Sequence, residues 1–217
     1  MKDISKTRRN SGRYFYPFCQ RLEMRSRLCS LMGKERLPVT IGTFHGIYYG
    51  ILRWTYRIGQ KNLLSDNAKK YQILRQVIRH QKLEIFDEGD FLKDIAFEIG
   101  KIKNQRIRPE EFISEKCEAA VFRQIYREYE EQRKRRRKID FDDMLVLCFQ
   151  LFLSRPDVLR GWQKKFRYIL IDEFQDINQI QYDVIRMLAL PERNLFAVGD
   201  DDQGKFYGVL RGAEFQN

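Results

Sequence analysis

The sequence ILIDEFQD at Ile169–Asp176 reads as the end of a buried strand, predicted at 166–171, that runs into acidic residues. In open parallel sheets, ligands bind where the carboxyl ends of the strands meet. Mg²⁺ usually takes one or two carboxylates together with phosphate oxygens and waters, which suits Asp172 as its ligand. Glu173 suits the role of a base that orients or deprotonates an attacking water. The alternative is a strand that ends in a solvated acidic turn.

A second apolar strand is predicted at Leu195–Gly199, and it also runs into acidic residues. Helices are predicted at 140–153 and 179–188, so that helices alternate with strands. Nearer the N-terminus, near-helical spacing predicts a helix at 20–32. A short strand at Val39–Thr43 and a helix at about 46–56 are expected to follow it. This alternation favours an α/β fold whose parallel sheet is covered on both faces.

The stretch from about residue 60 to residue 138 has a different texture, with no convincing strand. Amphipathic segments predict helices at 66–81, 88–104 and 109–137. Pro109 stands where the start of a helix is expected, with two acidic residues in the following turn. We therefore expect three parts, which are an N-terminal part of the α/β domain at 1–59, an all-helical insert at 60–138 and a C-terminal part of the same domain at 139–217.

The chain is strongly basic. Its 217 residues carry 41 Lys and Arg against 30 Asp and Glu, a formal net charge of +11 with a pI near 9.5. Such a balance favours a polyanionic partner, most simply nucleic acid, although a basic surface can also serve solubility alone. Six consecutive cations at Arg133–Lys138 are a candidate contact to DNA phosphates. The alternative is a solvated helix end, where cations suit the helix dipole.

Cysteine and histidine usage argues against metal and disulfide frameworks. The four cysteines form no C-x-x-C pair and only two histidines occur, so zinc-ligand spacing is absent. Reduced thiols in the cytoplasm are the expectation. No apolar run approaches the roughly 18 residues of a membrane helix, and no signal peptide is visible, so we expect no membrane partner. The sequence carries no indication of oligomeric state.

Several short motifs together resemble those of UvrD/Rep-type superfamily 1 DNA helicases. DEFQDIN at 172–178 resembles motif II (Walker B) of that family. VGDDDQ at 198–203 and RGA at 211–213 resemble the start and the end of its motif III. GTFHG at 42–46 and IDFDDM at 139–144 resemble two further family segments, and the helical insert falls in the family's place. The resemblance covers most of residues 20–217 and implies a partial RecA-like parallel sheet of the P-loop NTPase type.

The resemblance also implies roles for individual residues. Asp172 would hold the Mg²⁺ of ATP, Glu173 would activate water, and Gln203 would contact the γ-phosphate and its attacking water. The residues that would face single-stranded DNA are Thr43, Phe44, His45, Tyr207 and Arg211. Tyrosine offers a ring for base stacking and arginine pairs with phosphate. For these five, ordinary packing or local hydrogen bonding is the open alternative.

ATP hydrolysis in this fold needs a G-x-x-x-x-G-K-[ST] loop to hold the phosphates. The near-match at Gly199–Lys205 is rejected because it is followed by Phe206, which cannot bind Mg²⁺, and because three aspartates lie inside it. EMRSR at 23–27 resembles the tail of a family segment that follows the real loop. Seven residues separate Gln203 from Arg211, where the family has about five, and Leu210 replaces an aromatic residue. We therefore expect a fragment that lacks the loop and the second motor domain.

The predicted function is that of a fragment of an ATP-dependent DNA helicase or translocase, with ATP and Mg²⁺ as the family's cofactors and negligible ATP hydrolysis by this chain alone. Its expected partner is single-stranded DNA or a junction of single-stranded and duplex DNA, and DNA repair is among the functions that the resemblance implies. The alternative is a non-catalytic DNA-binding or interaction module derived from such a helicase. That module would bind single strands without any dependence on nucleotide.

Overall fold

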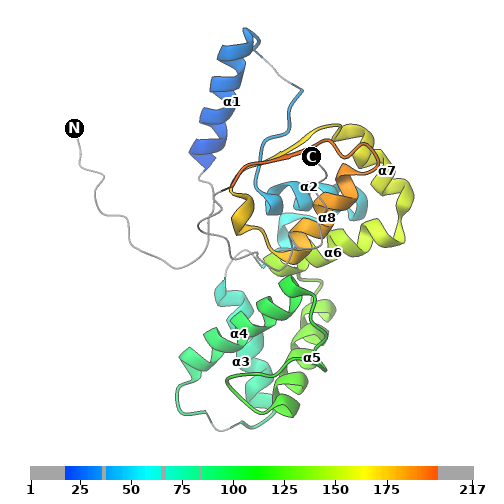
Figure 1. Cartoon of the computed structure of the whole chain (residues 1–217). Coiled ribbons are helices and arrows are strands. Elements are labelled where there is room, and N and C mark those ends of the chain that lie inside the picture. Colours follow the sequence, from blue (N-terminus) through cyan, green and yellow to red (C-terminus); the bar gives the residue numbers. More distant parts are fainter. Residues whose placement is uncertain (1–17, 36–37, 65–66, 84, 200–217) are drawn as a thin grey trace, which may run out of the picture. The chain divides into compact units, whose positions relative to one another are not determined.

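The structure is a computed structural model that describes residues 18–35, 38–64, 67–83 and 85–199 (Figure 1). The chain divides into two compact units, residues 1–47 and residues 48–217, which are described separately. Helices dominate both units, and one small parallel sheet is present in the described part of the chain. The α/β class is therefore confirmed at this coarse level.

The first unit contains α1 (Phe18–Met32) and the beginning of α2 (Phe44–Tyr56). Gly33, with φ of +61°, ends α1, and Lys34 N donates to Cys29 O at 3.0 Å, which is the hydrogen bond of a Schellman motif. Thr43 Oγ1 accepts from Gly46 N at 3.2 Å, as an N-cap of α2 does. The strand expected at Val39–Thr43 is wrong, because these residues are not extended in any ladder. A strand needs a neighbour for its N–H and C=O groups, and the described residues of this unit contain none.

Three long helices make up most of residues 60–138, the segment predicted as an insert and called the insert below. A short 3-10 helix, η1 (Gln60–Asn62), leads to α3 (Asn67–His80), α4 (Glu88–Gln105) and α5 (Ala119–Arg135). Asp87 caps α4 by accepting from Asp90 N at 3.0 Å. Apolar residues at helical spacing on all three helices meet in one buried cluster, which includes Leu74, Ile99 and Phe122. Figure 1 shows α3, α4 and α5 gathered in one group of helices.

The third of these helices begins ten residues later than the sequence predicted. The segment from Pro109 to Glu118 is not helical. Phe112 is instead buried in the core of the insert. Glu98, on α4, accepts hydrogen bonds from Ser114 Oγ at 2.6 Å and from Glu115 N at 2.8 Å. These contacts hold the segment across α4, so tertiary contacts override the local signals for a helix start.

The two ends of the insert lie side by side. Leu64 N donates to Ile139 O and Ile139 N donates to Asn62 O, both at 2.8 Å, which forms an isolated parallel bridge. After the bridge come α6 (Phe141–Ser154), α7 (Pro156–Lys165) and, beyond the first strand, α8 (Gln179–Ala189). The sequence did not predict α7. Helix α6 packs against α4, α7 and α8.

The sheet consists of β1 (Ile169–Ile171) and β2 (Leu195–Ala197), which pair in parallel with Leu170 opposite Phe196. The short 3-10 helix η2 (Phe174–Asp176) and α8 connect the strands. Ile171 is buried, whereas Leu170 and Phe196 are 75% and 63% exposed. One face of the pair is therefore exposed in the structure, and the prediction of a sheet covered on both faces is wrong for the described strands. No helix among the described residues is long and apolar enough to cross a membrane.

Candidate functional site at the strand ends

Hydrogen bonds hold the carboxyl ends of β1 and β2 together. Val198 N donates to Ile171 O, and Phe174 N donates to Val198 O, both at 2.9 Å. The second bond folds the chain after β1 back over the end of β2. Asp172 and Glu173 lie between these two anchors, and both are exposed. The acids thus emerge at the edge of the sheet where the sequence predicted them.

Glu173 has a left-handed backbone, with φ of 55° and ψ of 47°. This conformation is costly for a residue with a side chain. Glu173 N donates to Asp172 Oδ1 at 3.1 Å, and its carboxylate accepts from Gln175 Nε2 at 2.6 Å. Strained residues of this kind gather at functional sites, where the surrounding structure holds them in place. The turn therefore orients both carboxylates through local contacts.

Gly199 allows β2 to end against the same turn. A Cβ atom at this position would lie 2.6 Å from Gln175 Oε1 and 3.2 Å from the backbone nitrogens of Phe174 and Gln175. Backbone atoms cannot move away as a flexible side chain can, so a side chain at residue 199 would push the strand end from the turn. The glycine therefore allows Val198 and Gly199, which directly follow β2, to lie against the turn that contains Asp172 and Glu173.

The structure describes some of the other predicted site residues. Thr43, Phe44 and His45 are half-buried at the first turn of α2, in the first unit of the chain. Gln203, Tyr207 and Arg211 lie outside the described residues. Asp172, Glu173 and the end of β2 are thus the predicted elements that the structure brings together. The predicted roles of all eight residues stay predictions.

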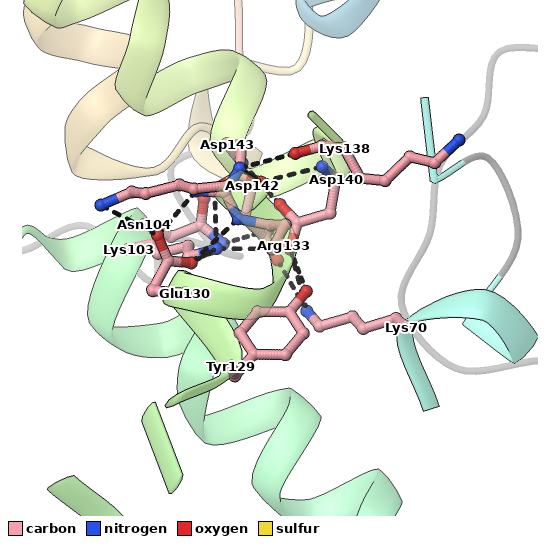
Figure 2. A network of polar contacts seen from close by, with 11 residues as sticks. Lys70, Lys103, Asn104, Tyr129, Glu130, Arg133, Lys138, Asp140, Asp142 and Asp143 are labelled. Carbon is pink, nitrogen blue, oxygen red and sulfur yellow. Dashed lines mark hydrogen bonds and ion pairs between the residues drawn. The ribbon is translucent and has the colours of Figure 1, made fainter. Parts of the chain in front are cut away.

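The IDFDDM segment lies in a buried polar network (Figure 2). Asp140 caps α6 by accepting from Asp143 N at 2.7 Å, and Asp143 accepts in return from Asp140 N at 2.9 Å. Lys103, from α4, places its Nζ 2.7 Å from Asp143 Oδ1 and 3.3 Å from Asp140 Oδ2. This ammonium group also lies 2.8 Å from Glu130 Oε1 on α5. One lysine therefore joins the first turn of α6 to two helices of the insert.

Three further side chains complete the network. Tyr129 Oη donates to Asp140 Oδ2 at 2.9 Å, and Lys70 Nζ, from α3, lies 3.3 Å from Asp142 Oδ2. Arg133 donates to Glu130 at 2.6 Å and lies 3.0 Å from Asp143. Arg133 is the first cation of the run that is a candidate contact to DNA phosphates, but it is buried and paired. It is therefore unavailable to phosphates.

Burial opposes ionisation of each buried group, and the neighbouring charges decide the outcome. Burial raises the pKa of Asp140, but Lys103 and Lys70 outweigh it and hold that pKa well below its usual value. Burial, joined by the charge of Asp140, raises the pKa of Asp143 even though two cations lie against it. Burial lowers the pKa of Lys103, yet the surrounding carboxylates raise it well above its usual value. Lys103 therefore stays charged inside the protein.

A chain of hydrogen bonds runs from this network to the segment after β1. Asn178, which caps α8, donates through Nδ2 to Asn104 Oδ1 at 3.2 Å, and Asn104 donates to Asp142 Oδ1 at 2.9 Å. Arg106, at the end of α4, adds an ion pair to Asp183 on α8 at 2.6 Å. The DEFQDIN segment and the insert are thus joined by side chains as well as by helix packing.

A family model described as the UvrD/REP helicase N-terminal domain matches residues 21–217. The chain belongs to the UvrD/REP helicase family. The match includes the strand ends, the IDFDDM segment and the whole insert. The family assignment made from the short motifs is therefore confirmed.

The relatives of this chain are DNA helicases by name, and two of the three that follow are named as ATP-dependent. The protein YjcD of Bacillus subtilis is 39% identical over 193 residues, which is 83% of this chain and 24% of that protein. ATP-dependent DNA helicase PcrA of Staphylococcus epidermidis is 33% identical over 202 residues, and DNA helicase II of Escherichia coli is 32% identical over 200. Each alignment covers 90% of this chain and 27% of the relative. The chain spans about a quarter of the length of these relatives.

Sequence reasoning about this UvrD/REP helicase domain missed the polar network and its link to α8. A signal was present for Lys103, because it follows Ile95, Ile99 and Ile102 at helical spacing on the buried face of α4. A cation at an apolar position needs a buried partner. The pattern could not say which carboxylates supply it, because Asp140 and Asp143 are 37 and 40 residues away.

Proposed function

We propose that this chain is the ATP-binding motor portion of an ATP-dependent DNA helicase or translocase, in which ATP hydrolysis is coupled to movement along single-stranded DNA. The meeting of β1 and β2 at their carboxyl ends, where Asp172 and Glu173 emerge, carries the proposal. Family membership and the names of the relatives support it. In the full arrangement that we propose, residues 1–59 and 139–217 build one RecA-like sheet, and the insert at 60–138 interrupts it.

The residues at the strand ends fit a bound Mg²⁺. Asp172 is exposed, and one of its oxygens accepts from Glu173 N, which leaves the other for a metal ion. Mg²⁺ needs few protein carboxylates when phosphate oxygens and waters complete its shell. When bound, the ion would neutralise charge on the phosphates of ATP. Glu173, held by Gln175, would orient the attacking water and accept its proton.

We assign the coupling to DNA to the residues that the motifs indicate. Gln203 follows β2 by a few residues and would contact the terminal phosphate. Thr43, Phe44, His45, Tyr207 and Arg211 would contact a DNA strand, at a single-stranded region or a junction with duplex. The basic balance of the chain supports a polyanionic partner. Cytoplasmic localisation and a function in DNA repair accord with this activity.

A paramagnetic ion tests the metal role of Asp172 directly. Mn²⁺ takes the oxygen ligands that Mg²⁺ takes, and it broadens the amide resonances of nearby residues. We expect Mn²⁺ to broaden the resonances of Ile171, Glu173 and Gly199, and Asp172→Asn to remove the effect. Asp176→Asn is the matched control, because Asp176 is an exposed acid in the same turn and should leave the broadening unchanged. Equal loss in both variants would overturn the assignment.

A turnover measurement tests Glu173 and the expectation of inactivity. We expect this chain alone to hydrolyse ATP far more slowly than about 1 s⁻¹, the low end of working enzymes, because it contains no G-x-x-x-x-G-K-[ST] loop. The assay would use ATP, Mg²⁺ and oligodeoxythymidine. If the chain hydrolyses ATP faster than that rate and Glu173→Gln abolishes the turnover, the expected inactivity is refuted and the role of Glu173 as the base is supported. If the chain hydrolyses ATP faster than that rate and Glu173→Gln leaves the turnover unchanged, both the expected inactivity and the role of Glu173 as the base are refuted.

A further inference from the structure

An aromatic and cationic cleft lies between the end of α2 and helix α7. Its volume is about 580 Å³, and its walls include Trp54, Arg57, Trp162 and Lys165. Helix α7 ends at Lys165, and the chain enters β1 at its amino end, Ile169. Asp172 and Glu173 follow the opposite, carboxyl end of that strand. The cleft is therefore separate from the site proposed for ATP.

The aromatic rings of the cleft have two different environments. Trp162 is held in place, because it stacks on Phe166 with centroids 5.4 Å apart and an interplanar angle of 26°. Trp54 meets Trp162 edge-on, with centroids 6.2 Å apart and an angle of 85°. Trp54 is nevertheless 70% exposed. A tryptophan with its ring in solvent beside a rigid aromatic wall is a platform on which a planar ligand can stack.

Cations outnumber acids along the cleft. Its ionisable lining residues are Arg57, Arg155, Lys165 and Asp157. Arg155 and Asp157 neutralise each other through two hydrogen bonds, at 2.9 and 2.7 Å. Lys165 Nζ lies 4.5 Å from the ring centroid of Trp162, and Arg57 is exposed. Among the described residues that line the cleft, Lys165 and Arg57 thus supply two positive charges beside the aromatic platform that no acid of the lining neutralises.

We propose that this cleft is a second binding site for single-stranded nucleic acid, in which a base stacks on Trp54 while Lys165 and Arg57 neutralise the adjoining phosphates. Every base has an aromatic face, so a ring and nearby cations suit any sequence. In duplex DNA the faces of the bases are already stacked on one another, so a single strand is the form that fits. The site goes beyond the proposed function, because it needs neither ATP nor the residues at the strand ends.

The chain offers a direct readout of this cleft, because Trp54 and Trp162 are its only two tryptophans. We expect oligodeoxythymidine to quench the tryptophan fluorescence in a saturable way, and added salt to reverse the quenching. Inorganic phosphate at the same phosphate concentration should leave the fluorescence unchanged. Equal quenching by polyglutamate would overturn the proposal in favour of an acidic protein partner. No quenching at DNA concentrations where anisotropy shows a complex would also overturn it.

Substitutions at exposed positions test the stacking without unfolding the chain. Trp54→Leu should weaken the binding that Trp162 fluorescence reports by about 5- to 150-fold, the range for the loss of one stacked base. Tyr56→Leu is the matched control, since Tyr56 is an exposed aromatic residue of the same helix that does not line the cleft. It should change the affinity less than about twofold. Equal effects of the two variants would refute stacking on Trp54.

The cations are tested in the same way. Arg57 has φ of 54°, a conformation that glycine adopts without strain, so Arg57→Gly removes the charge at no cost in backbone strain. Arg57→Gly and Lys165→Gln should both weaken the binding of DNA and make its affinity less dependent on salt. Arg53→Gln is the control, because Arg53 lies one turn away on α2 and does not line the cleft, and it should change neither quantity. An unchanged salt slope in the first two variants would refute their contact with phosphate. Arg211→Gln tests the DNA contact of the proposed function, so the two proposals can fail separately.

Discussion

The helical insert and the strand pair β1–β2 differ in how they are stabilised and in what they expose. The insert buries a hydrophobic cluster drawn from its three long helices, and it closes one end with paired charges. Each strand of the pair is three residues long, and the pair exposes Leu170 and Phe196. Glu173, which follows β1, has a strained left-handed backbone. Of these two regions, the insert is the more deeply buried, and the candidate chemistry lies on the more exposed one.

The largest expected effect is in the buried network. Lys103→Met should lower the free energy of unfolding by about 3–5 kcal/mol, because it removes the buried cation that Glu130, Asp140 and Asp143 share. The melting temperature should fall by roughly 6–20 °C. Lys93→Met is the matched control on the same helix, since Lys93 pairs with Asp90 in solvent and its loss should not move the melting temperature measurably. Similar melting temperatures for the two variants would refute the role of the network.

A second pair of variants compares the two regions directly. Ile99→Ala should cost about 2–5 kcal/mol, because Ile99 is fully buried and its removal leaves a cavity in the insert. Leu170→Ala on β1 should cost less than about 0.5 kcal/mol, because Leu170 is exposed. Chemical denaturation followed by circular dichroism measures both. A larger loss for the strand variant would reverse the comparison.

Acid should act on the buried network through Glu130 and Asp140. Burial raises the pKa of Glu130, but Arg133 and Lys103 outweigh it, so this pKa, like that of Asp140, is depressed in the folded chain. A carboxyl group of this kind contributes stability above its unfolded pKa, near 4, and loses that contribution as the pH falls through its folded pKa. Asp143 is the opposite case, because its pKa is raised in the folded chain. Its contribution to stability is complete below its unfolded pKa, near 4, so it does not change in the pH range where Glu130 and Asp140 lose theirs.

We therefore expect the melting temperature to fall as the pH drops from about 4 to about 2. Glu130→Gln should be less stable at neutral pH and should show a shallower fall in acid. Asp94→Asn, which removes a more exposed acid of α4, should keep the slope of the unmodified chain. Parallel curves for the unmodified chain and Glu130→Gln would contradict the assignment of the acid effect to this network.

A small gain in stability is expected at the strand end. Glu173→Gly should raise the free energy of unfolding by about 0.5–1 kcal/mol, because glycine relieves the left-handed backbone at a smaller entropic cost. Asp176→Gly, in the same turn but outside the left-handed region, should lower it. Thermal unfolding of the two variants provides the measurement. A loss of stability in Glu173→Gly would show that the carboxylate held by Gln175 stabilises the turn more than the strain weakens it.

Local patterns predicted much of the fold. The helical spacing of apolar residues located α3, α4 and α8 to within a few residues of their observed ends, and the apolar runs located both strands. The position of Asp172 and Glu173 also followed from the sequence, because a strand that ends in acids places them at the edge of its sheet. These features depend on residues close together in the chain, so a linear pattern contains the information.

Packing between distant segments decided the rest. The late start of α5 depends on Glu98, which holds residues 114 and 115 across α4. The cleft depends on Trp54 and Trp162, which meet although more than a hundred residues separate them. The prediction of a strand at Val39–Thr43 was wrong, because a strand forms only where a neighbouring backbone can pair with it. Sequence alone determined which segments could be helices, strands or acidic turns. Tertiary structure decided which charges were paired and which rings faced solvent, since desolvation depends on what lies nearby in space.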